Sequence, residues 1–207
     1  MRPDRLVAVL GTATDVGKTW VGAEVLARLR AAGVRVAARK PAQSFAPGDG
    51  ATDADVLAAA TGESPEVVCP PHRWYEVPMA PPMAADALGR PPVRLAELLG
   101  ELAWPDGVAV GWVETVGGPR SPVAADADSA SLAAALRPDL VVLVAGAGLG
   151  AVNAVLLSAP SVARPTVVVL NRWDEADDLH RRNRDWLARA GLDVVTGAHD
   201  VAARLLR

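Results

Sequence analysis

The chain has 207 residues, 51% of them hydrophobic, and a formal net charge of −3, which is typical of a globular protein that buries one core. Its basic residues are scattered rather than gathered in a stripe, so we expect no nucleic-acid partner. A single cysteine, Cys69, excludes an intrachain disulfide, and no apolar run reaches the roughly 18 residues of a membrane span. With no signal-peptide pattern at its start, the chain is expected to form one domain over residues 1–207, in the cytoplasm and without a membrane partner.

A glycine-rich loop follows the first predicted strand. Residues 5–10 predict a strand, because residues 6–10 are all apolar, and residues 17–32 carry apolar side chains at helical spacing. The loop between them reads GTATDVGKT over residues 11–19. In such a loop the backbone N–H groups bind phosphate oxygens, Lys18 reaches the outer phosphates and the Thr19 hydroxyl ligates Mg²⁺. Five residues rather than the usual four separate the first glycine from the Gly-Lys-Thr triplet, so we interpret the stretch as a variant phosphate-binding loop.

The second predicted strand leads to a lysine and then to two aspartates. Residues 34–38 predict the strand, and Lys40 follows its carboxyl end, where open parallel sheets bind ligands. An ordinary surface lysine fits this position equally well. After a loop rich in glycine and proline, Asp53 and Asp55 begin a helix that is predicted to run to Thr61. Both aspartates cap that helix in the simpler interpretation, and either could instead reach a metal held at the phosphates.

The middle of the chain is rich in proline and ends in a buried strand. Residues 65–83 predict an irregular crossing segment with a short helix after Met83, and residues 93–102 predict a further helix. The expected core residues of that helix are Leu95, Leu98, Leu99 and Leu102. Residues 108–113 are apolar throughout, as in a strand covered on both faces, and Glu114 follows them. An unpaired buried carboxylate is costly, so Glu114 indicates a metal or a lysine partner.

The last third of the chain repeats the alternation of strands and helices. Residues 140–145 predict the fourth strand, and the glycines of residues 146–150 open a helix that contains Asn153. We interpret this helix start as a second anion-accepting N-terminus. Residues 166–170 predict the fifth strand, and Asn171 at its end could read an adenine edge or cap a turn. The remaining predicted elements are a helix over 178–190, a short strand over 193–195 and a helix over 201–205.

This alternation predicts an α/β fold, with a mostly parallel, doubly wound sheet, helices on both faces and the arrangement of a P-loop NTPase. The carboxyl edge of the sheet would collect Lys18, Thr19, Lys40, Asp53 and Glu114. Lysines neutralise charge on a transferring phosphoryl group and carboxylates hold Mg²⁺, so the residues favour phosphoryl transfer. They do not identify the acceptor.

The order and spacing of these motifs resemble the dethiobiotin synthetase family over nearly the whole chain. GTATDVGKT is similar to the family's GTDTxVGKT, Lys40-Pro41-Ala42-Gln43-Ser44 to its KPxxSG, and Thr52-Asp53 to its serine-aspartate pair. Further matches are Ala80 to Ala85 with SPHLAA, Leu88 to Pro91 with EGRP, Glu114 to Gly118 with EGAGG, Leu149 to Asn153 with LGxxN, and Asn171 with the nucleotide-base asparagine.

The resemblance implies a single P-loop ligase domain that uses ATP and Mg²⁺ to close a ureido ring on 7,8-diaminopelargonate with CO₂, in biotin biosynthesis. One amine of the substrate becomes a carbamate, the carbamate attacks the γ-phosphate of the nucleoside triphosphate, and the second amine displaces phosphate from the carbamic-phosphoric anhydride. The family also implies a homodimer whose substrate site lies at the interface.

The same resemblance implies a role for particular residues. The implied catalytic residues are Lys18, Lys40, Thr14 and Ser44, and the implied metal ligands are Thr19, Asp53 and Glu114. The implied nucleotide-binding residues are Thr14, Asp15, Val16, Gly17, Lys18, Thr19, Trp20, Asn171 and Gly197, the last in Val195-Thr196-Gly197, which replaces the family's proline-rich turn. The implied substrate-binding residues are Thr14, Lys40, Ser44, Gly117 and Gly118, with Leu149, Gly150 and Asn153 from the neighbouring subunit.

Several residues depart from the family pattern and keep alternatives open. Ala13 replaces the loop aspartate, and Phe45 replaces the glycine after Ser44. Thr115-Val116 replaces a glycine-alanine pair, and we expect these β-branched side chains to narrow the site for the diamine. One alternative is a diverged paralogue that binds ATP without diamine turnover. Another is a nucleotide switch of the partition or septum-positioning type, although such proteins carry a second lysine early in the loop and this chain does not.

Overall fold

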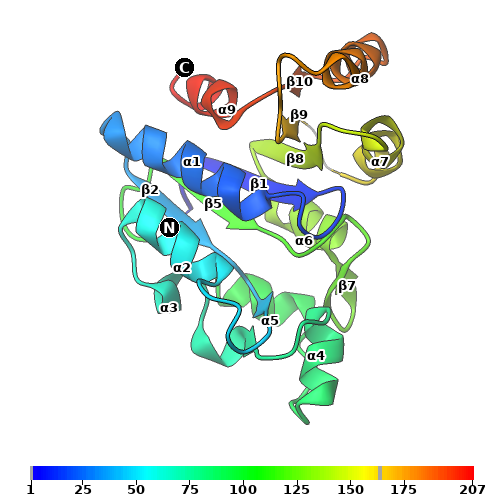
Figure 1. The fold of residues 1–207 in the computed structure, drawn as a ribbon. Helices are drawn as coiled ribbons and strands as arrows, with labels where there is room; N and C mark the ends of the chain where they lie inside the picture. The colour runs from blue at the N-terminus through cyan, green and yellow to red at the C-terminus, as the bar shows by residue number, and fades with distance from the viewer. Residues whose placement is uncertain (1, 163–164) are drawn as a thin grey trace.

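The computed structural model describes residues 2–162 and 165–207, which fold around a six-stranded sheet (Figure 1). Its strands lie in the order β10-β9-β8-β1-β5-β2, and neighbouring strands are parallel. They are β1 (Arg5–Gly11), β2 (Val36–Arg39), β5 (Val110–Glu114), β8 (Leu140–Gly146), β9 (Thr166–Asn171) and β10 (Val194–Val195). The predicted parallel, doubly wound α/β fold is therefore confirmed.

Helices cover both faces of the sheet, which is why its strands are apolar throughout rather than alternating with polar residues. In β1, Val7 and Val9 belong to the core on one face, and Ala8 and Leu10 belong to the core on the other. The first core is closed by α1 (Lys18–Ala31), α2 (Asp53–Thr61), α3 (Pro65–Val68) and α9 (Ala198–Leu205). The second is closed by α6 (Ser129–Leu136), α7 (Ala151–Ser158) and α8 (Asp178–Arg189).

The register of the sheet brings the predicted site residues to one edge. Arg39 of β2 pairs with Val113 of β5, so Lys40 and Glu114 follow at the same level of adjacent strands. On the other side of β5, Glu114 pairs with Val9 of β1, and the phosphate loop begins two residues later. Ligands in such sheets bind at the carboxyl ends of the strands, and the three segments meet there.

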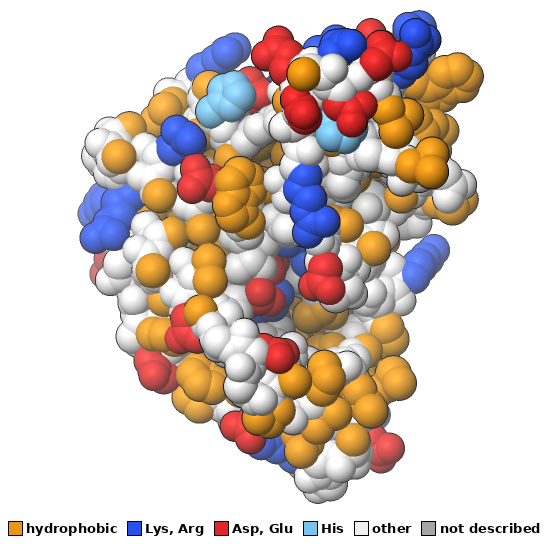
Figure 2. Space-filling view, viewed as in Figure 1, with side chains coloured by type: hydrophobic (Ala, Val, Ile, Leu, Met, Phe, Trp, Pro, Cys, Tyr) orange, Lys and Arg blue, Asp and Glu red, His pale blue; other side chains and the backbone are white. Residues whose placement is uncertain are grey.

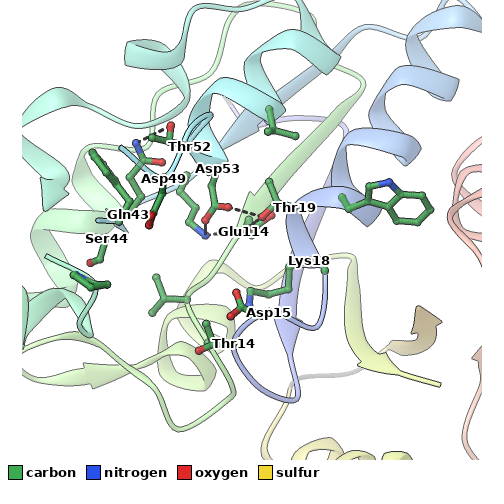
Figure 3. A pocket seen from close by; sticks show the side chains of 18 of the residues that line it. Thr14, Asp15, Lys18, Thr19, Gln43, Ser44, Asp49, Thr52, Asp53 and Glu114 are labelled. Atoms are coloured by element: carbon green, nitrogen blue, oxygen red, sulfur yellow. Dashed lines mark hydrogen bonds and ion pairs between the residues drawn. The ribbon is translucent and has the colours of Figure 1, made fainter. Parts of the chain in front are cut away.

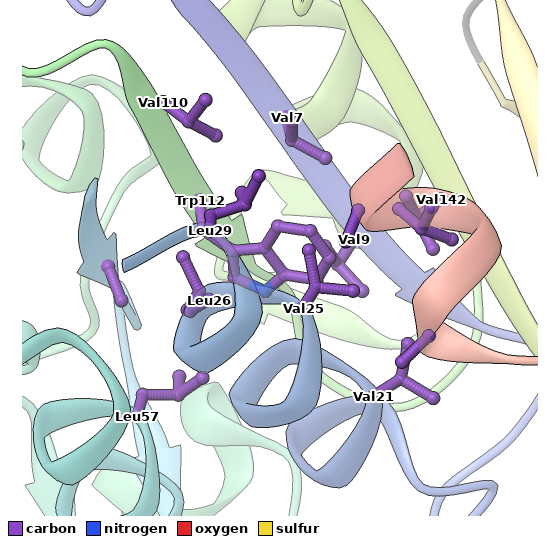
Figure 4. Close-up of a cluster of buried hydrophobic side chains, with 14 of the residues drawn as sticks. Val7, Val9, Val21, Val25, Leu26, Leu29, Leu57, Val110, Trp112 and Val142 are labelled. Atoms are coloured by element: carbon purple, nitrogen blue, oxygen red, sulfur yellow. The ribbon is translucent and has the colours of Figure 1, made fainter. Parts of the chain in front are cut away.

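Trp112 of β5 is fully buried beneath α1 (Figure 4), where Val25, Leu26 and Leu29 surround its ring. Gly22 of α1 lies directly over this indole. A Cβ atom at position 22 would meet Nε1 of Trp112 at 2.7 Å and Cδ2 of Leu57 at 3.2 Å. The helix can approach the sheet this closely because residue 22 has no side chain.

We expect Gly22→Ala to destabilise the protein. Overpacking a core costs about 1–3 kcal/mol, whereas the better helix propensity of alanine recovers about 1 kcal/mol, so the net loss should be roughly 1 kcal/mol. Urea unfolding of the variant measures it as a lower midpoint at unchanged slope. Gly100→Ala is the matched control, because Gly100 ends α5 (Leu95–Gly100) with open space around it. An equal loss in the two variants would remove the steric explanation.

The proline-rich segment contains more regular structure than the sequence predicts. It forms α3, a 3₁₀ turn (η1, Pro71–Arg73), β4 (Trp74–Tyr75) and α4 (Pro81–Ala87). The helix expected after Met83 starts instead at Pro81, because a proline in the first helical turn has no N–H to leave unpaired. β4 pairs with β3 (Gln43–Ser44) in a small parallel sheet, which converts part of a predicted loop into a strand.

Other element boundaries also differ from the expectation. Helix α5 is shorter than 93–102, so Leu102 lies outside it, and of the four leucines expected in the core only Leu98 is fully buried. Residues 119–137, for which no element was predicted, form the hairpin strands β6 (Pro122–Ala124) and β7 (Ala127–Asp128) and then α6. The sequence did contain one signal for α6, because Asp128 is a typical N-cap residue. In the structure its carboxylate accepts a hydrogen bond from the backbone N–H of Ser131. A 3₁₀ turn (η2, Ala159–Ser161) extends α7.

Within the described ranges, none of the helices combines the length and hydropathy that a bilayer crossing requires.

Candidate active site

A cleft of about 920 Å³ opens at the carboxyl edge of the sheet. Figure 2 shows this face, with acidic and basic side chains around a hollow near its centre. The phosphate loop and the end of β5 form one side of the cleft, and residues 43–53 and 78–80 form the other. The chain has two lysines, Lys18 and Lys40, and both line this cleft. Every other basic residue of the chain is an arginine or a histidine.

Lys40 is the centre of a compact charged cluster, whose other members Thr19, Asp53 and Glu114 are labelled in Figure 3. Its ammonium group, on a residue that is 2% exposed, lies 2.7 Å from Oδ2 of Asp53 and 2.7 Å from Oε1 of Glu114. The hydroxyl of Thr19 lies 2.7 Å from Oδ1 of Asp53 and 2.9 Å from Oε1 of Glu114. Four side chains from α1, α2 and the ends of β2 and β5 therefore meet at one point.

Burial and neighbouring charges act in opposite directions on the ionisable groups of this cluster. Burial disfavours the charged form of Lys40, but the fields and hydrogen bonds of Asp53 and Glu114 outweigh it and raise the pKa of this lysine. Burial likewise opposes ionisation of Asp53, but Lys40 and the Thr19 hydroxyl lower its pKa to about 2. For Glu114, burial and then the Asp53 charge raise the pKa against the opposing effect of Lys40. Burial, followed by repulsion from Lys40, lowers the pKa of Lys18.

The cluster contains the oxygen ligands that Mg²⁺ requires. Oε2 of Glu114 is buried and has no hydrogen-bond partner in the part of the chain that the structure describes, an arrangement that a bound cation would satisfy. Asp53, Glu114 and Thr19 present hard oxygen atoms, but no group of three or more acidic, histidine or cysteine side chains able to hold a metal occurs within residues 2–162 and 165–207. Two carboxylates and one hydroxyl fit Mg²⁺, because this ion usually binds one or two protein carboxylates and completes its octahedral coordination with phosphate oxygens and water.

The phosphate loop leaves its N–H groups open to an anion. Gly17 is the N-cap of α1 in a left-handed conformation, with no side-chain cap and no acidic residue in the first turn, so the first helical N–H groups have no side-chain acceptor. Nζ of Lys18 donates to the carbonyl of Ala13 across the loop at 3.4 Å. Thr14 and Asp15 line the cleft, whereas the side chain of Val16 packs against the core.

A second cleft, of about 500 Å³, continues from the loop towards β10. It brings together Trp20, Asn171 and Gly197, which are far apart in sequence and were all predicted to bind the nucleotide. Nδ2 of Asn171 donates to the carbonyl of Val16 at 2.9 Å. The residue expected to read an adenine edge or to cap a turn thus holds the phosphate loop in this structure.

The similarity of the chain to known proteins extends over most of its length. A family model described as an AAA domain matches residues 5–198. A relative from Anaeromyxobacter dehalogenans is 39% identical over 178 residues, covering 82% of this chain and 78% of that protein. Relatives from Streptomyces avermitilis and Rhodococcus jostii are 37% and 36% identical, covering 93% and 97% of this chain and 80% and 88% of their own. All three are named ATP-dependent dethiobiotin synthetase BioD. The chain belongs to the dethiobiotin synthetase family.

Membership of the dethiobiotin synthetase family makes the chain a ligase-type enzyme that uses ATP. A solved Borrelia burgdorferi plasmid partition protein bound to AMPPNP is also similar in structure, with a TM-score of 0.55 and 14% identity. The similarity covers 97% of this chain and 90% of that one. It shows a shared P-loop NTPase fold and nothing about what this chain binds.

Two of the residues in which the chain departs from the dethiobiotin synthetase pattern, Phe45 and Val116, line the first cleft, whereas Ala13 and Thr115 do not. Phe45 and Val116 lie in its wall, and Phe45 directly follows Ser44, whose Oγ is buried with no hydrogen-bond partner among the described residues. Gly117 has φ +51°, and a Cβ there would meet Oγ of Ser121 at 2.2 Å. Gly118 does not line the cleft, and its N–H donates to the same serine oxygen at 2.9 Å.

Three predicted substrate-binding residues lie elsewhere in this chain. Leu149, Gly150 and Asn153 form the start of α7 and line neither cleft. Leu149 is 94% exposed. The structure therefore does not bring them to the cleft of their own subunit.

Sequence reasoning missed several residues of the two clefts. These are Gln43, Asp49, Pro78, Met79, Ala80, Ser121, Arg172, Trp173 and Thr196. Gln43 has a structural role, since its amide oxygen accepts from the N–H of Ala54 at 3.0 Å and its amide nitrogen donates to Thr52 at 3.3 Å. Residues 78–80 reach the cleft through the β3–β4 pairing, for which the sequence contains no local signal. Arg172, Trp173 and Thr196 stand next to residues that were predicted.

The structure distinguishes the two aspartates at the start of α2. Asp53 joins the charged cluster, whereas the carboxylate of Asp55 accepts from the N–H of Thr52 at 2.7 Å and from its hydroxyl at 2.8 Å, as half of a capping box. We expect Asp55→Ala to cost about 1 kcal/mol of unfolding free energy and to leave Mg²⁺ dependence unchanged. Asp53→Asn is the matched variant and should weaken Mg²⁺ dependence. A metal titration and a urea curve of each variant test this, and the reverse pattern would show that the roles are exchanged.

Proposed function

We propose that this chain is an ATP- and Mg²⁺-dependent dethiobiotin synthetase that closes the ureido ring of dethiobiotin on 7,8-diaminopelargonate with CO₂. The observation that carries the proposal is the buried Lys40, held between Asp53 and Glu114 beside Thr19 of the phosphate loop. The family of the chain supplies the reaction, and this cluster supplies the charges that the reaction needs.

ATP would span the two clefts. Its phosphates would accept hydrogen bonds from the loop and the start of α1, with Lys18 at the outer phosphates. Thr19, Asp53 and Glu114 would hold Mg²⁺, which neutralises phosphate charge when bound. The nucleobase would lie in the second cleft, where Trp20, which is 56% exposed, and Trp173 provide aromatic surface.

The chemistry would proceed at the meeting of the clefts. A carbamate oxygen attacks the γ-phosphorus and ADP leaves, and the second amine then attacks the carbamoyl carbon and inorganic phosphate leaves. Lys40 would stabilise the carbamate and the phosphoryl group during transfer, because Asp53 and Glu114 raise its pKa and favour its charged form, and because it is screened from water. The unpartnered Oγ of Ser44 and the hydroxyl of Thr14 offer hydrogen bonds to the diamine end of the substrate.

The substrate carboxylate would bind to the start of α7 in the neighbouring subunit of a homodimer. Three observations support a partner at this face: Leu149 and Leu157 are 94% and 72% exposed, and Trp186 of the adjacent α8 is 58% exposed. Apolar side chains gathered on neighbouring helices are typical of an interaction surface. The mass of the protein in solution by light scattering tests the dimer.

Phosphate release from Mg-ATP and bicarbonate, with and without 7,8-diaminopelargonate, tests the reaction. Diamine-dependent release together with a ring-closed product detected by mass spectrometry would establish the ligase. Release that does not depend on the diamine, or nucleotide binding without turnover, would favour the diverged paralogue. Phe45 and Val116 in the cleft wall are the observation that keeps this second candidate open.

A further inference from the structure

Arg172 occupies the junction of the two clefts. Gly17, Trp20 and Arg172 line both of them, and Arg172 is the charged member of the three. It follows Asn171 at the carboxyl end of β9. If ATP spans the clefts as proposed above, this side chain stands between the base and the outer phosphates.

The side chain of Arg172 holds the phosphate loop. Nη2 of its guanidinium donates to the carbonyl of Asp15 at 2.8 Å, next to the bond from Asn171 to the carbonyl of Val16 at 2.9 Å. Asn171 and Arg172, at the end of β9, thus donate hydrogen bonds to two consecutive carbonyls of the phosphate loop. With these carbonyls bound from outside, the loop N–H groups are directed towards the phosphate site.

Both residues joined by this hydrogen bond, Asp15 and Arg172, have an unusual backbone conformation. Asp15 has φ +59° and Arg172 has φ +58°, a left-handed conformation that residues other than glycine adopt at a cost. Such conformations persist where surrounding contacts enforce them. The hydrogen bond between Arg172 and Asp15 joins these two residues directly.

The charge of Arg172 is free to act on an anion. Within residues 2–162 and 165–207 its guanidinium forms no ion pair with a carboxylate, in contrast to Lys40, which forms two. The side chain is exposed at the lip of the phosphate cleft. Of the cations that line this cleft, Lys40 is already balanced, so Lys18 and Arg172 remain to compensate phosphate charge.

We propose that Arg172 is a positioning residue for nucleoside triphosphate, which clamps the phosphate loop through Asp15 and adds positive charge at the boundary between the base and phosphate sites. The identity of the ligand rests on the proposed function, whereas the clamp itself concerns nucleotide binding alone. Arg172 does not touch the reacting atoms in this scheme, so its loss should affect ATP affinity and KM more than kcat.

Arg172→Met tests the proposal, because methionine keeps an apolar stem and removes the donors and the charge. We expect titration calorimetry with Mg-ATP, in the absence of the diamine, to show binding weakened about tenfold, as for loss of a charge-assisted hydrogen bond. Adenosine, which lacks phosphates, should bind both proteins alike, and Arg172→Lys should recover part of the ATP affinity. In turnover, KM for ATP should rise while kcat stays within about twofold.

Arg137→Met is the matched control. Arg137 is also an exposed arginine with a left-handed backbone, φ +48°, but it ends α6 and lines neither cleft. Wild-type ATP affinity in Arg172→Met, or an equal loss in Arg137→Met, would overturn the clamp. Tight ATP binding by the wild-type chain without ring closure would refute the proposed reaction and leave the clamp standing. Absence of ATP binding by the wild-type chain would overturn both.

Discussion

Lys40→Ala should abolish turnover while nucleotide binding persists. The ammonium group of Lys40 is the positive charge enclosed between Asp53 and Glu114, and no water-exposed cation can replace it at that depth. Removing one preorganised charge from such a site costs about 10²–10³-fold in rate or more. ATP should still bind, because the loop, Lys18 and the second cleft are intact. Phosphate release with the diamine present measures the first effect, and titration calorimetry measures the second.

The variant also leaves the fully buried Glu114 and the partly exposed Asp53 without their cationic partner, and an unpaired buried charge destabilises proteins by several kcal/mol. Circular dichroism and thermal unfolding in Mg²⁺ therefore accompany the assay, so that loss of fold is not mistaken for loss of chemistry. The double variant Lys40→Ala/Glu114→Gln removes one of the unpaired charges and should fold better without regaining turnover. Wild-type turnover in folded Lys40→Ala would exclude Lys40 from the mechanism.

Glu114→Gln should raise the Mg²⁺ concentration needed for activity. Glu114 is fully buried, and its unpartnered Oε2 is the atom best placed for a cation. Glutamine keeps the shape but removes the charge, and altering even the outer partners of a metal site weakens metal affinity by about 10–100-fold. The loss of a direct ligand should be at least as large.

A titration of turnover against Mg²⁺ measures this effect, with Glu97→Gln as the control. Glu97 is exposed on α5 and lines neither cleft. A wild-type metal titration in Glu114→Gln would show that Asp53 and Thr19 are sufficient. It would then assign Glu114 to holding Lys40 alone, and the orphaned oxygen would need another explanation.

The sheet and the phosphate loop could be predicted because their signals are local. The apolar runs that became β1, β5, β8 and β9 contain their own evidence, as does the Gly-Lys-Thr triplet. Lys40 and Glu114 could be placed at the same edge of the sheet, because each follows the carboxyl end of a parallel strand and ligands bind at that edge. The predicted roles of these residues stay predictions, since contacts alone do not test them.

The parts that could not be predicted depend on contacts between distant segments. Asp53 and Asp55 are equivalent in sequence, and the tertiary position of Lys40 against one of them separates their roles. Asn171 had two local interpretations, and the structure gives a third, because Val16 lies 155 positions earlier in the chain. The helix after Asp128 was missed for a different reason, since its cap was visible but its eight residues are too short for a clear period.

The presence of both lysines in one cleft determines how this protein responds to chemical labelling. Amine-directed acylating or alkylating reagents find no lysine on the remaining surface. Of the two, Lys18 is the better nucleophile, because burial lowers its pKa, whereas the raised pKa of Lys40 keeps that amine protonated. Modification of a lysine side chain thus reports directly on whether the phosphate cleft is occupied, and coupling to a dye or a support through a lysine would block the site itself.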